Sequence, residues 1–310
     1  MSAHLPQVVA VVGATATGKS DLALDLASAV GGEVINADAM QLYRGMDIGT
    51  NKVPVGQRRG IEHHLLDILE VTDEATLADY QARAELAVVD VLGRGRLPVL
   101  AGGSGLYVRA ALDHLEIPPT DPAVRARLEA QAGSEGGAAA LRARLAEVDP
   151  AAAQAIEPNN TRRIIRALEV VEITGRAFSA TAPTKRHRRP SLVIGLRDDW
   201  DALTERIGRR VEAMWAAGLL DEVARLDTEG LRQGRTSSRA IGYAQALGEL
   251  DGRWGRDEAI ADTARATRRY ARRQESWWRP DHRVVWLDAA DPALADTALG
   301  LLRRPTQWTP

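Results

Sequence analysis

The sequence predicts an α/β protein with a P-loop-containing parallel sheet core and a helical insertion domain. Two observations predict the core: short apolar runs at 7–12 and 97–101 lead straight into glycine, and helical patterns lie between them. Strands that alternate with helices in this way favour a parallel sheet that is covered on both faces. A third observation predicts the insertion, because no strand pattern stands out from about residue 121 to 175.

The first part of the core follows in chain order. Gln7–Val12 is an unbroken apolar run that ends at glycine, which indicates a buried strand. Residues 19–30 carry apolar side chains at helical spacing, and 33–36 is the next expected strand. Thr76–Leu92 is expected to form a longer amphipathic helix, closed by glycines, before the third strand at Leu97–Ala101.

The pattern changes at Pro118-Pro119. From there alanine, leucine, arginine and glutamate dominate, and these residues are good helix formers. Strand patterns return at Ser191–Leu196 and Arg283–Leu287. We therefore expect a discontinuous core, made of residues 1–118 and 188–310, with a helical insertion at 119–187.

Composition narrows the possible functions. The chain has 310 residues and no cysteine, which excludes disulfides, thiolate metal sites and cysteine nucleophiles. It shows neither a membrane-length apolar run nor a signal-peptide pattern, so we expect a cytoplasmic protein without a membrane partner. The net charge of −2 argues against nucleic acid, but segments 162–189 and 265–283 are rich in arginine and can form a basic face.

Residues 13–20 match the phosphate-loop pattern G-x-x-x-x-G-K-[ST]. Glycines let the backbone wrap around phosphate oxygens, and successive N–H groups at a helix start form an anion nest. Lys19 would place a cation on the terminal phosphates, and the Ser20 hydroxyl would reach Mg²⁺. A ligand-free tight turn is the alternative, but the flanking strand and helix favour phosphate binding. The motif does not choose between ATP, GTP and an isoprenyl diphosphate. The expected diphosphate-binding residues are Gly13, Ala14, Thr15, Ala16, Thr17, Gly18, Lys19 and Ser20.

Asp38 follows the strand at 33–36, at the kind of strand end where ligands gather in parallel sheets. An aspartate in this position can also simply cap the next helix. Its position alone therefore leaves both roles open.

A series of motifs carries a resemblance to one family. Residues 38–45 read Asp-Ala-Met-Gln-Leu-Tyr-Arg-Gly, 48–52 read Ile-Gly-Thr-Asn-Lys, and 102–107 read Gly-Gly-Ser-Gly-Leu-Tyr. Arg162–Glu169, Arg239–Tyr243 and Thr267–Gln274 continue the series. The chain resembles the tRNA dimethylallyltransferases in these motifs, in family order. Ser104 departs from the family's usual threonine but keeps the hydroxyl.

The resemblance implies a reaction. A dimethylallyl group would pass from dimethylallyl diphosphate to N6 of the adenine 3′ of the anticodon, in tRNAs reading codons that begin with U, with release of diphosphate. Adenine N6 is a poor nucleophile because its lone pair is delocalised, so we expect Asp38 to take its proton. Lys19, the loop N–H groups and Mg²⁺ on Ser20 would stabilise the leaving diphosphate. Ser104 would bind the metal, position the adenine or hydrogen-bond N6, and Arg239 would clamp the diphosphate.

The expected partner is a tRNA anticodon stem-loop, gripped by the helical insertion, whose target adenine leaves its stack. The residues expected to contact it are Asp38, Ala39, Met40, Gln41, Arg162, Arg163, Ile164, Ile165, Arg166, Arg239, Gly242, Tyr243, Arg268 and Arg272. Arginines from 265 to 273 recur at helical spacing, which predicts a phosphate-binding stripe without interleaved acids. Trp277 and Trp278 are expected in the core. We expect a monomer.

His63 and His64 invite a metal or acid–base interpretation. Adjacent strand residues point to opposite faces, so the pair is a poor bidentate ligand. We expect them to be structural or to line the site.

Three other functions compete with the transferase. Prenylation of free adenine nucleotides would share the phosphate loop and Asp38 but would have less use for an arginine-bearing insertion. A P-loop kinase or NTPase would use ATP and would not need the motifs at Ser104 and Arg239. A nucleotide-dependent RNA-binding switch would keep its RNA affinity after Asp38→Ala and lose no chemistry.

Overall fold

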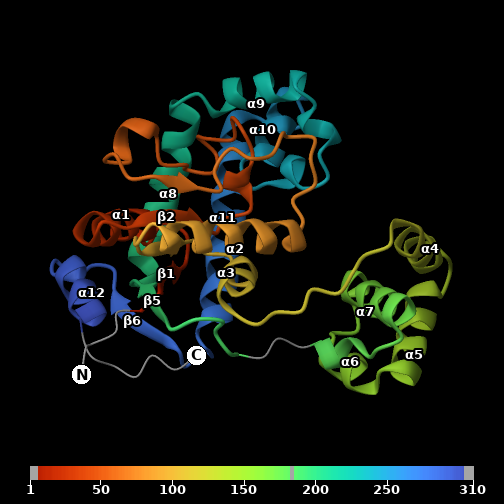
Figure 1. Cartoon of the computed structure of the whole chain (residues 1–310). Helices are drawn as coiled ribbons and strands as arrows, with labels where there is room; N and C mark the ends of the chain where they lie inside the picture. Colours follow the sequence, from red (N-terminus) through yellow and green to blue (C-terminus); the bar gives the residue numbers. More distant parts are fainter. Residues whose placement is uncertain (1–5, 182–184, 304–310) are drawn as a thin grey trace. The chain divides into compact units, whose positions relative to one another are not determined.

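The computed structural model describes residues 6–181 and 185–303, which form two compact units. One unit combines residues up to Leu112 with those from His187 onward, and the other is Asp113–Arg186 (Figure 1). The first boundary lies earlier than the sequence indicated. Residues just before 119 belong to the second unit because Arg166 donates to the carbonyl oxygens of Pro118 and Pro119, at 2.6 and 2.9 Å.

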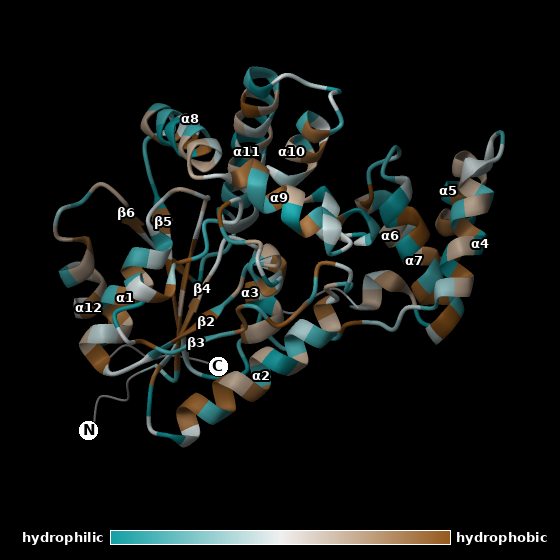
Figure 2. Ribbon diagram, turned by 90° about the horizontal axis from the view of Figure 1, so that it is seen from above, coloured by the Kyte–Doolittle hydropathy of each residue, from teal (hydrophilic) through white to brown (hydrophobic). Residues whose placement is uncertain are grey.

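A six-stranded parallel sheet forms the centre of the first unit, which confirms the predicted fold class. Its strands lie in the order β3-β2-β4-β1-β5-β6. The bounds are β1 Val8–Gly13, β2 Glu33–Asn36, β3 His63–His64, β4 Pro98–Ala101, β5 Ser191–Arg197 and β6 Val284–Asp288. The inner strands are buried on both faces, which explains their unbroken apolar runs (Figure 2).

Helices pack on both faces of this sheet. On one face α1 (Lys19–Val30) and α12 (Leu294–Arg303) contact each other, and their leucines share a core with Val9, Val11 and Ile194. On the other lie α2 (Leu77–Gly93), α3 (Gly105–Leu112) and the long α11 (Arg256–Trp278), which contacts β1. The Thr76 side chain caps α2 by accepting from the Asp79 N–H at 3.1 Å.

A second core of the first unit is helical. It joins α8 (Trp200–Ala216), α9 (Leu219–Thr228), α10 (Tyr243–Leu250) and α11 to residues that follow the carboxyl ends of β1 and β2, among them Ala14, Tyr43 and Met46. These helices therefore cover the end of the sheet where the phosphate loop begins.

The second unit is helical in its described part, as predicted. Its helices are α4 (Pro122–Gly133), α5 (Gly137–Val148), α6 (Pro150–Ala155) and α7 (Thr161–Thr174). Asp121, Asp149 and Asn160 cap α4, α6 and α7 with their side chains, which explains the breaks between helices. Leu128, Leu141 and Leu168 contribute to a core of its own. Across the part of the chain that the structure describes, no helix has both the length and the apolar character needed to span a bilayer.

Candidate active site

Three neighbouring strands bring the predicted site residues together. The strand order β2-β4-β1 places Asp38, Ser104 and the loop 13–18 after three adjacent carboxyl ends. Ligands of open α/β sheets bind at such strand ends. Residues that are far apart in the sequence therefore surround one region.

The phosphate loop has the backbone that its glycines predict. Gly13 and Gly18 have φ of 138° and 82°, and a Cβ at Gly13 would lie 2.5 Å from the Leu196 carbonyl oxygen. Thr17 is buried, and its hydroxyl donates to the Ala14 carbonyl at 2.8 Å. Lys19 Nζ donates to the same carbonyl at 2.5 Å, so the lysine lies over the loop. The loop thus presents N–H groups and a cation to one side.

Two cavities adjoin the loop. The larger has a volume of about 1110 Å³ and is lined by Lys19, Ser20 and Gln41 among others. The smaller, of about 320 Å³, has a largely apolar lining and is bordered by Ser104 and Tyr270. Asp38, Thr15, Ala16, Thr50 and Arg210 line both. A reacting group at Asp38 can therefore reach ligands in either cavity.

Asp38 both caps a helix and faces the cavities, so the two roles left open by the sequence coexist. Its Oδ1 accepts from the Met40 N–H at 2.9 Å, and its own N–H donates to Asn36 Oδ1 at 2.9 Å. Burial raises the pKa of Asp38, and the Met40 N–H and the Lys19 and Arg210 cations oppose that rise. A carboxylate with a raised pKa binds a proton more strongly, which suits a general base.

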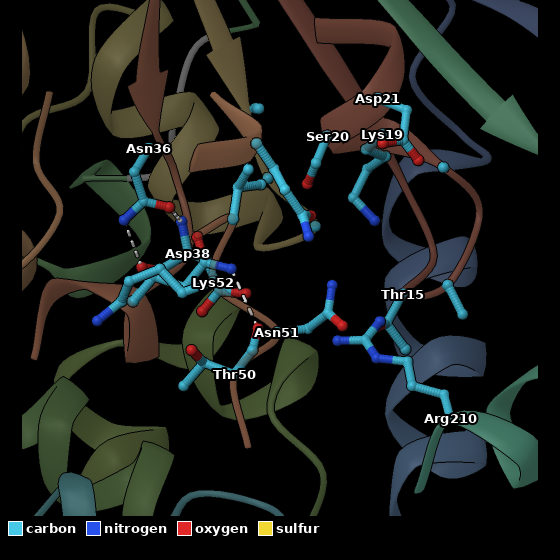
Figure 3. Close-up of a pocket in the computed structure, with 18 of the residues that line it drawn as sticks. Thr15, Lys19, Ser20, Asp21, Asn36, Asp38, Thr50, Asn51, Lys52 and Arg210 are labelled. Atoms are coloured by element: carbon cyan, nitrogen blue, oxygen red, sulfur yellow. Dashed lines mark hydrogen bonds between the residues drawn. The ribbon is translucent and has the colours of Figure 1, made fainter. Parts of the chain in front are cut away.

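Arg210 is a cation that sequence reasoning missed. It projects from α8 toward the phosphate loop, where Nη1 donates to Thr15 Oγ1 at 3.3 Å (Figure 3). Among residues 6–181 and 185–303, no carboxylate pairs with it, and its buried Nε has no hydrogen-bond partner. Burial lowers its pKa, and burial together with the nearby Arg210 lowers the pKa of Lys19 to about 8. Two partly buried cations that repel each other favour an anion between them.

The sequence signal for this cation was weak but present. Arg206 and Arg210 lie one turn apart in the middle of α8, the helix that follows β5. Arg206 Nη1 donates to the Ala16 carbonyl at 2.8 Å and pairs with Asp198 at 2.6 Å. The signal in the sequence is a pair of arginines at i and i+4 on the helix that follows a core strand.

The residues present fit Mg²⁺ in the way that phosphate enzymes hold it. Ser20 lines the larger cavity next to Lys19, at the start of α1. Within the described residues, no group of three or more His, Cys, Asp or Glu side chains is placed to hold a metal by itself. Mg²⁺ is commonly held by few protein ligands together with substrate phosphates. Ser20 fits that pattern.

Comparison with known proteins assigns the family. The family model described as IPP transferase matches residues 41–281. The chain belongs to the IPP transferase family. It is 57% identical over 300 residues to the tRNA dimethylallyltransferase of Thermobifida fusca (strain YX), covering 95% of this chain and 94% of the relative. It is 55% identical over 309 residues to that of Kineococcus radiotolerans, covering 98% and 96%.

Solved structures of the IPP transferase family also align with the chain. The full-length tRNA isopentenylpyrophosphate transferase of Bacillus halodurans superposes with a TM-score of 0.70 and 40% identity, covering 96% of this chain and 97% of the other. A eukaryotic dimethylallyltransferase, solved while acting on tRNA, gives 0.81 at 28% identity, covering 95% and 76%. The family signature therefore extends over both units of the chain.

Three of the residues predicted to contact RNA have buried side chains, and their contact with RNA stays a prediction. Tyr243 is fully buried, and its hydroxyl donates to Glu222 Oε1 at 2.5 Å, so its ring is part of the core. Ile164 and Ile165 are also buried, in the core of the second unit. The motif at 162–166 alternates between surface and core because it lies on an amphipathic helix.

Arg239, a predicted catalytic residue, lines neither cavity. It lies in the short 3₁₀ turn Ser237–Arg239 and is exposed, outside the lining of both cavities. Its assignment as a diphosphate clamp stays a prediction, and Arg210 is an arginine that lines both cavities. Gly242, next to Tyr243, is buried, and its N–H donates to Gln245 Oε1 at 2.9 Å. Ala39, Met40 and Ser104 do line the smaller cavity.

The arginine stripe of α11 is less uniform than predicted. Arg265 pairs with Asp262, which lies one turn before the first arginine of the stripe. Arg272 stacks on Trp200 at 4.6 Å, Arg273 lines the smaller cavity, and the Nε of Arg268 is buried. Trp278 is buried as predicted, whereas Trp277 is 42% exposed, which corrects its assignment to the core.

The remaining motif residues have structural roles around the larger cavity. Lys52 is buried, and Nζ donates to the Tyr43 carbonyl at 2.9 Å and to Asp47 and Asp67 at 2.6 Å each. It thereby holds the segment 43–52 against residue 67. His64 bonds Glu33 at 2.6 Å while His63, which lines the cavity, bonds the Ile61 carbonyl at 2.9 Å. The two imidazoles have separate partners, in line with the expected opposite faces.

Proposed function

We propose that this chain transfers a dimethylallyl group from dimethylallyl diphosphate to N6 of the adenine 3′ of the anticodon in tRNA, in tRNAs reading codons that begin with U. The observation that carries the proposal is the position of Asp38. It lines both cavities, between the phosphate loop with its cations and a smaller apolar chamber. Membership of the IPP transferase family supports the same chemistry.

The reaction assigns one substrate to each cavity. The phosphate loop, Lys19 and Arg210 favour the diphosphate in the larger cavity. In an in-line displacement the attacking nitrogen lies opposite the leaving oxygen, so the adenine belongs in the smaller cavity with Ser104. The bond from N6 to the allylic carbon forms while the bond from that carbon to diphosphate oxygen breaks. The N6 proton passes to Asp38, and diphosphate leaves.

Charge is the second requirement of this step. Negative charge grows on the departing diphosphate, and the loop N–H groups, Lys19 and Arg210 are already oriented toward it. Bound through Ser20 and phosphate oxygens, Mg²⁺ would add positive charge there. These preorganised groups stabilise the transition state more than the ground state.

The second unit is proposed to hold the anticodon stem-loop. Arg162 and Arg163 begin α7 and are exposed, so both can contact phosphates. Arg166 instead ties α7 to the preceding segment through Pro118 and Pro119, which gives it a structural role beside its predicted one. We propose a monomer, and a tRNA substrate favours the cytoplasm.

The test is mass spectrometry of an unmodified anticodon stem-loop after incubation with protein, dimethylallyl diphosphate and Mg²⁺. We expect a gain of one dimethylallyl group on the loop adenine, strongly slowed by Asp38→Ala. Prenylation of AMP but not of RNA would instead assign the free-nucleotide activity. If neither is prenylated and phosphate transfer from ATP is found, the chain is a kinase and the proposal is wrong.

A further inference from the structure

A turn at residues 47–50 contributes to the walls of both cavities. Asp47, Ile48 and Thr50 line the larger cavity, and Gly49 and Thr50 line the smaller one. Under the proposed function the turn therefore borders the diphosphate on one side and the adenine on the other. Its position affects how the two substrates lie relative to each other.

A buried carboxylate of α9 holds this turn. Glu222 is only 9% exposed, and its Oε2 accepts from the backbone N–H groups of Asp47 and Ile48, at 3.2 and 2.9 Å. These bonds cross 175 and 174 residues of sequence. The one basic residue of α9, Arg225, pairs with Glu229. A carboxylate that is buried in this way needs hydrogen-bond donors, and the turn supplies two of them.

Tyr243 bonds the other oxygen of Glu222. Its hydroxyl donates to Oε1 at 2.5 Å, and its ring is fully buried. A Cβ on Gly49 would lie 2.4 Å from Cε2 of this ring, so the turn packs against the ring where it has no side chain. One carboxylate and one phenol thus contact three successive residues of the turn.

The reaction depends on where this turn lies. In the proposed displacement adenine N6 approaches the allylic carbon in line with the leaving oxygen, and a misplacement of about 1 Å can cost about 10²-fold in rate. Lys52 also holds the turn, through Asp47 Oδ1 at 2.6 Å, but it is a neighbour in sequence. Glu222 and Tyr243 instead join the turn to α9 and α10, and so to the helical core of the first unit.

We propose that Glu222 and Tyr243 are positioning residues that align the adenine with the diphosphate by fixing the turn at 47–50. Both lie outside the lining of the two cavities, so they act through the turn. The inference rests on the assignment of the cavities under the proposed function.

The experiment measures kcat for transfer to the anticodon stem-loop and, on the same protein, the affinity and stoichiometry of pyrophosphate binding with Mg²⁺ by calorimetry. Glu222→Ala leaves two N–H groups of the turn without their acceptor, and we expect kcat to fall by about 10²-fold. Tyr243→Phe keeps the ring against Gly49 and loses one hydrogen bond, so kcat should fall by about tenfold. Pyrophosphate affinity should stay within about threefold in both variants, because the phosphate loop is unchanged.

Two further variants separate positioning from general stability. Glu222→Gln should keep kcat within about threefold of the wild-type value, because its oxygen can accept both N–H groups and its NH₂ group can donate to the Tyr243 oxygen. Leu302→Ala removes a buried side chain from the core beneath α12. It should make the protein less stable to urea but leave kcat per pyrophosphate-binding site unchanged.

The outcomes separate this inference from the proposed function. If Glu222→Ala binds pyrophosphate with full stoichiometry and keeps the wild-type kcat, or if Leu302→Ala loses as much kcat, the positioning role is refuted while the transferase assignment stands. If the wild-type protein prenylates no RNA, the proposed function fails and the positioning role fails with it. Where Glu222→Ala does not fold, the kcat of Tyr243→Phe decides, and a wild-type value refutes the role.

Discussion

At the scale of single residues, Asp38 allows catalysis to be separated from structure. Asparagine can still accept the Met40 N–H that Asp38 Oδ1 accepts at 2.9 Å, so Asp38→Asn should fold normally. It cannot take a proton, and we expect kcat to fall by about 10²- to 10⁴-fold. Pyrophosphate affinity, measured by calorimetry, should not weaken, because the change removes a negative charge near the anion. A variant with near-normal kcat would mean that another group is the base.

The lowered pKa of Lys19 predicts how diphosphate binding depends on pH. Burial and the nearby Arg210 lower the pKa of Lys19 to about 8, so the cation is present below pH 8 and is lost as pH rises through that value. A bound anion favours the charged form and raises the pKa. Pyrophosphate affinity should therefore fall as pH rises above about 8. Lys19→Arg, which stays charged, should show a smaller fall under the same conditions, and identical profiles for both proteins would contradict this account.

We expect Arg210 to bind the diphosphate, although the sequence analysis did not identify it. Removing a charged hydrogen-bond donor from a buried anion site costs about 1.5–3 kcal/mol, so Arg210→Gln should raise KM for dimethylallyl diphosphate by about 10- to 100-fold. Arg209→Gln provides the matched control, because Arg209 is exposed on the same helix and pairs only with Glu205 at 3.0 Å among described residues. Equal KM values for the two variants would exclude Arg210 from the site.

The contrast between Lys19 and Arg210 shows what the sequence could reveal. Lys19 belongs to a contiguous motif whose geometry is local, so residues 13–20 could be interpreted without a structure. Arg210 becomes a site residue only because α8 packs over a loop whose Thr15 lies 195 residues earlier. Tyr243 is the opposite case, because the sequence singled it out and its side chain is buried. Its motif is typical of the family, but the side chain fills a core that only the packing of α9 and α10 defines.

At the scale of elements, β2 carries a buried charge at the end away from the site. Glu33 begins this strand, is fully buried and pairs with Arg94, Arg96 and His64. The Arg94 hydrogen bond, above all, lowers the pKa of Glu33 to about 2. The carboxylate therefore adds stability above its unfolded pKa of about 4.3, and that stability is lost as pH falls toward 2.

This pairing predicts an acid-dependent effect on stability. Glu33→Gln should lower the free energy of unfolding by about 2 kcal/mol at pH 7, as measured by urea denaturation. The difference from the wild-type protein should shrink as pH falls from about 4.5 to 2, since protonation makes the two side chains alike. Glu70→Gln, at an exposed pair with Arg44, should change stability by less than about 1 kcal/mol. If the difference in the free energy of unfolding did not depend on pH, it would come from packing and not from the charge of Glu33.

Elements also differ in how well their patterns could be interpreted. The buried strands β1 and β4 could be predicted because each is an apolar run that is followed by glycine. β3 has only two residues, so its place at the sheet edge comes from pairing with β2 and not from any run of its own. The stripe on α11 was visible as spacing, but which arginines face water depends on Asp262 and Trp200, which spacing along the stripe does not report.

At the scale of the whole molecule, the helical insertion should be removable. Two apolar clusters of the first unit draw their described residues from outside 113–186, and one cluster of the second unit lies within that range. The Arg188 N–H donates to the Leu112 carbonyl at 2.7 Å, so the chain leaves and re-enters the first unit at neighbouring points. A short glycine linker in place of residues 113–186 can bridge them.

This deletion tests whether the first unit binds the diphosphate and the second unit binds the RNA. The shortened protein should unfold cooperatively and bind pyrophosphate with Mg²⁺ within about threefold of the wild-type protein, because its cavities are lined by first-unit residues. Its affinity for the anticodon stem-loop should fall by about tenfold or more, and the dependence of that affinity on salt should become shallower as phosphate contacts are lost. In the full-length protein, Arg162→Gln with Arg163→Gln should reproduce part of both effects. Unchanged RNA affinity after excision would place RNA recognition on the first unit alone, with the arginines of α11 as its main contacts.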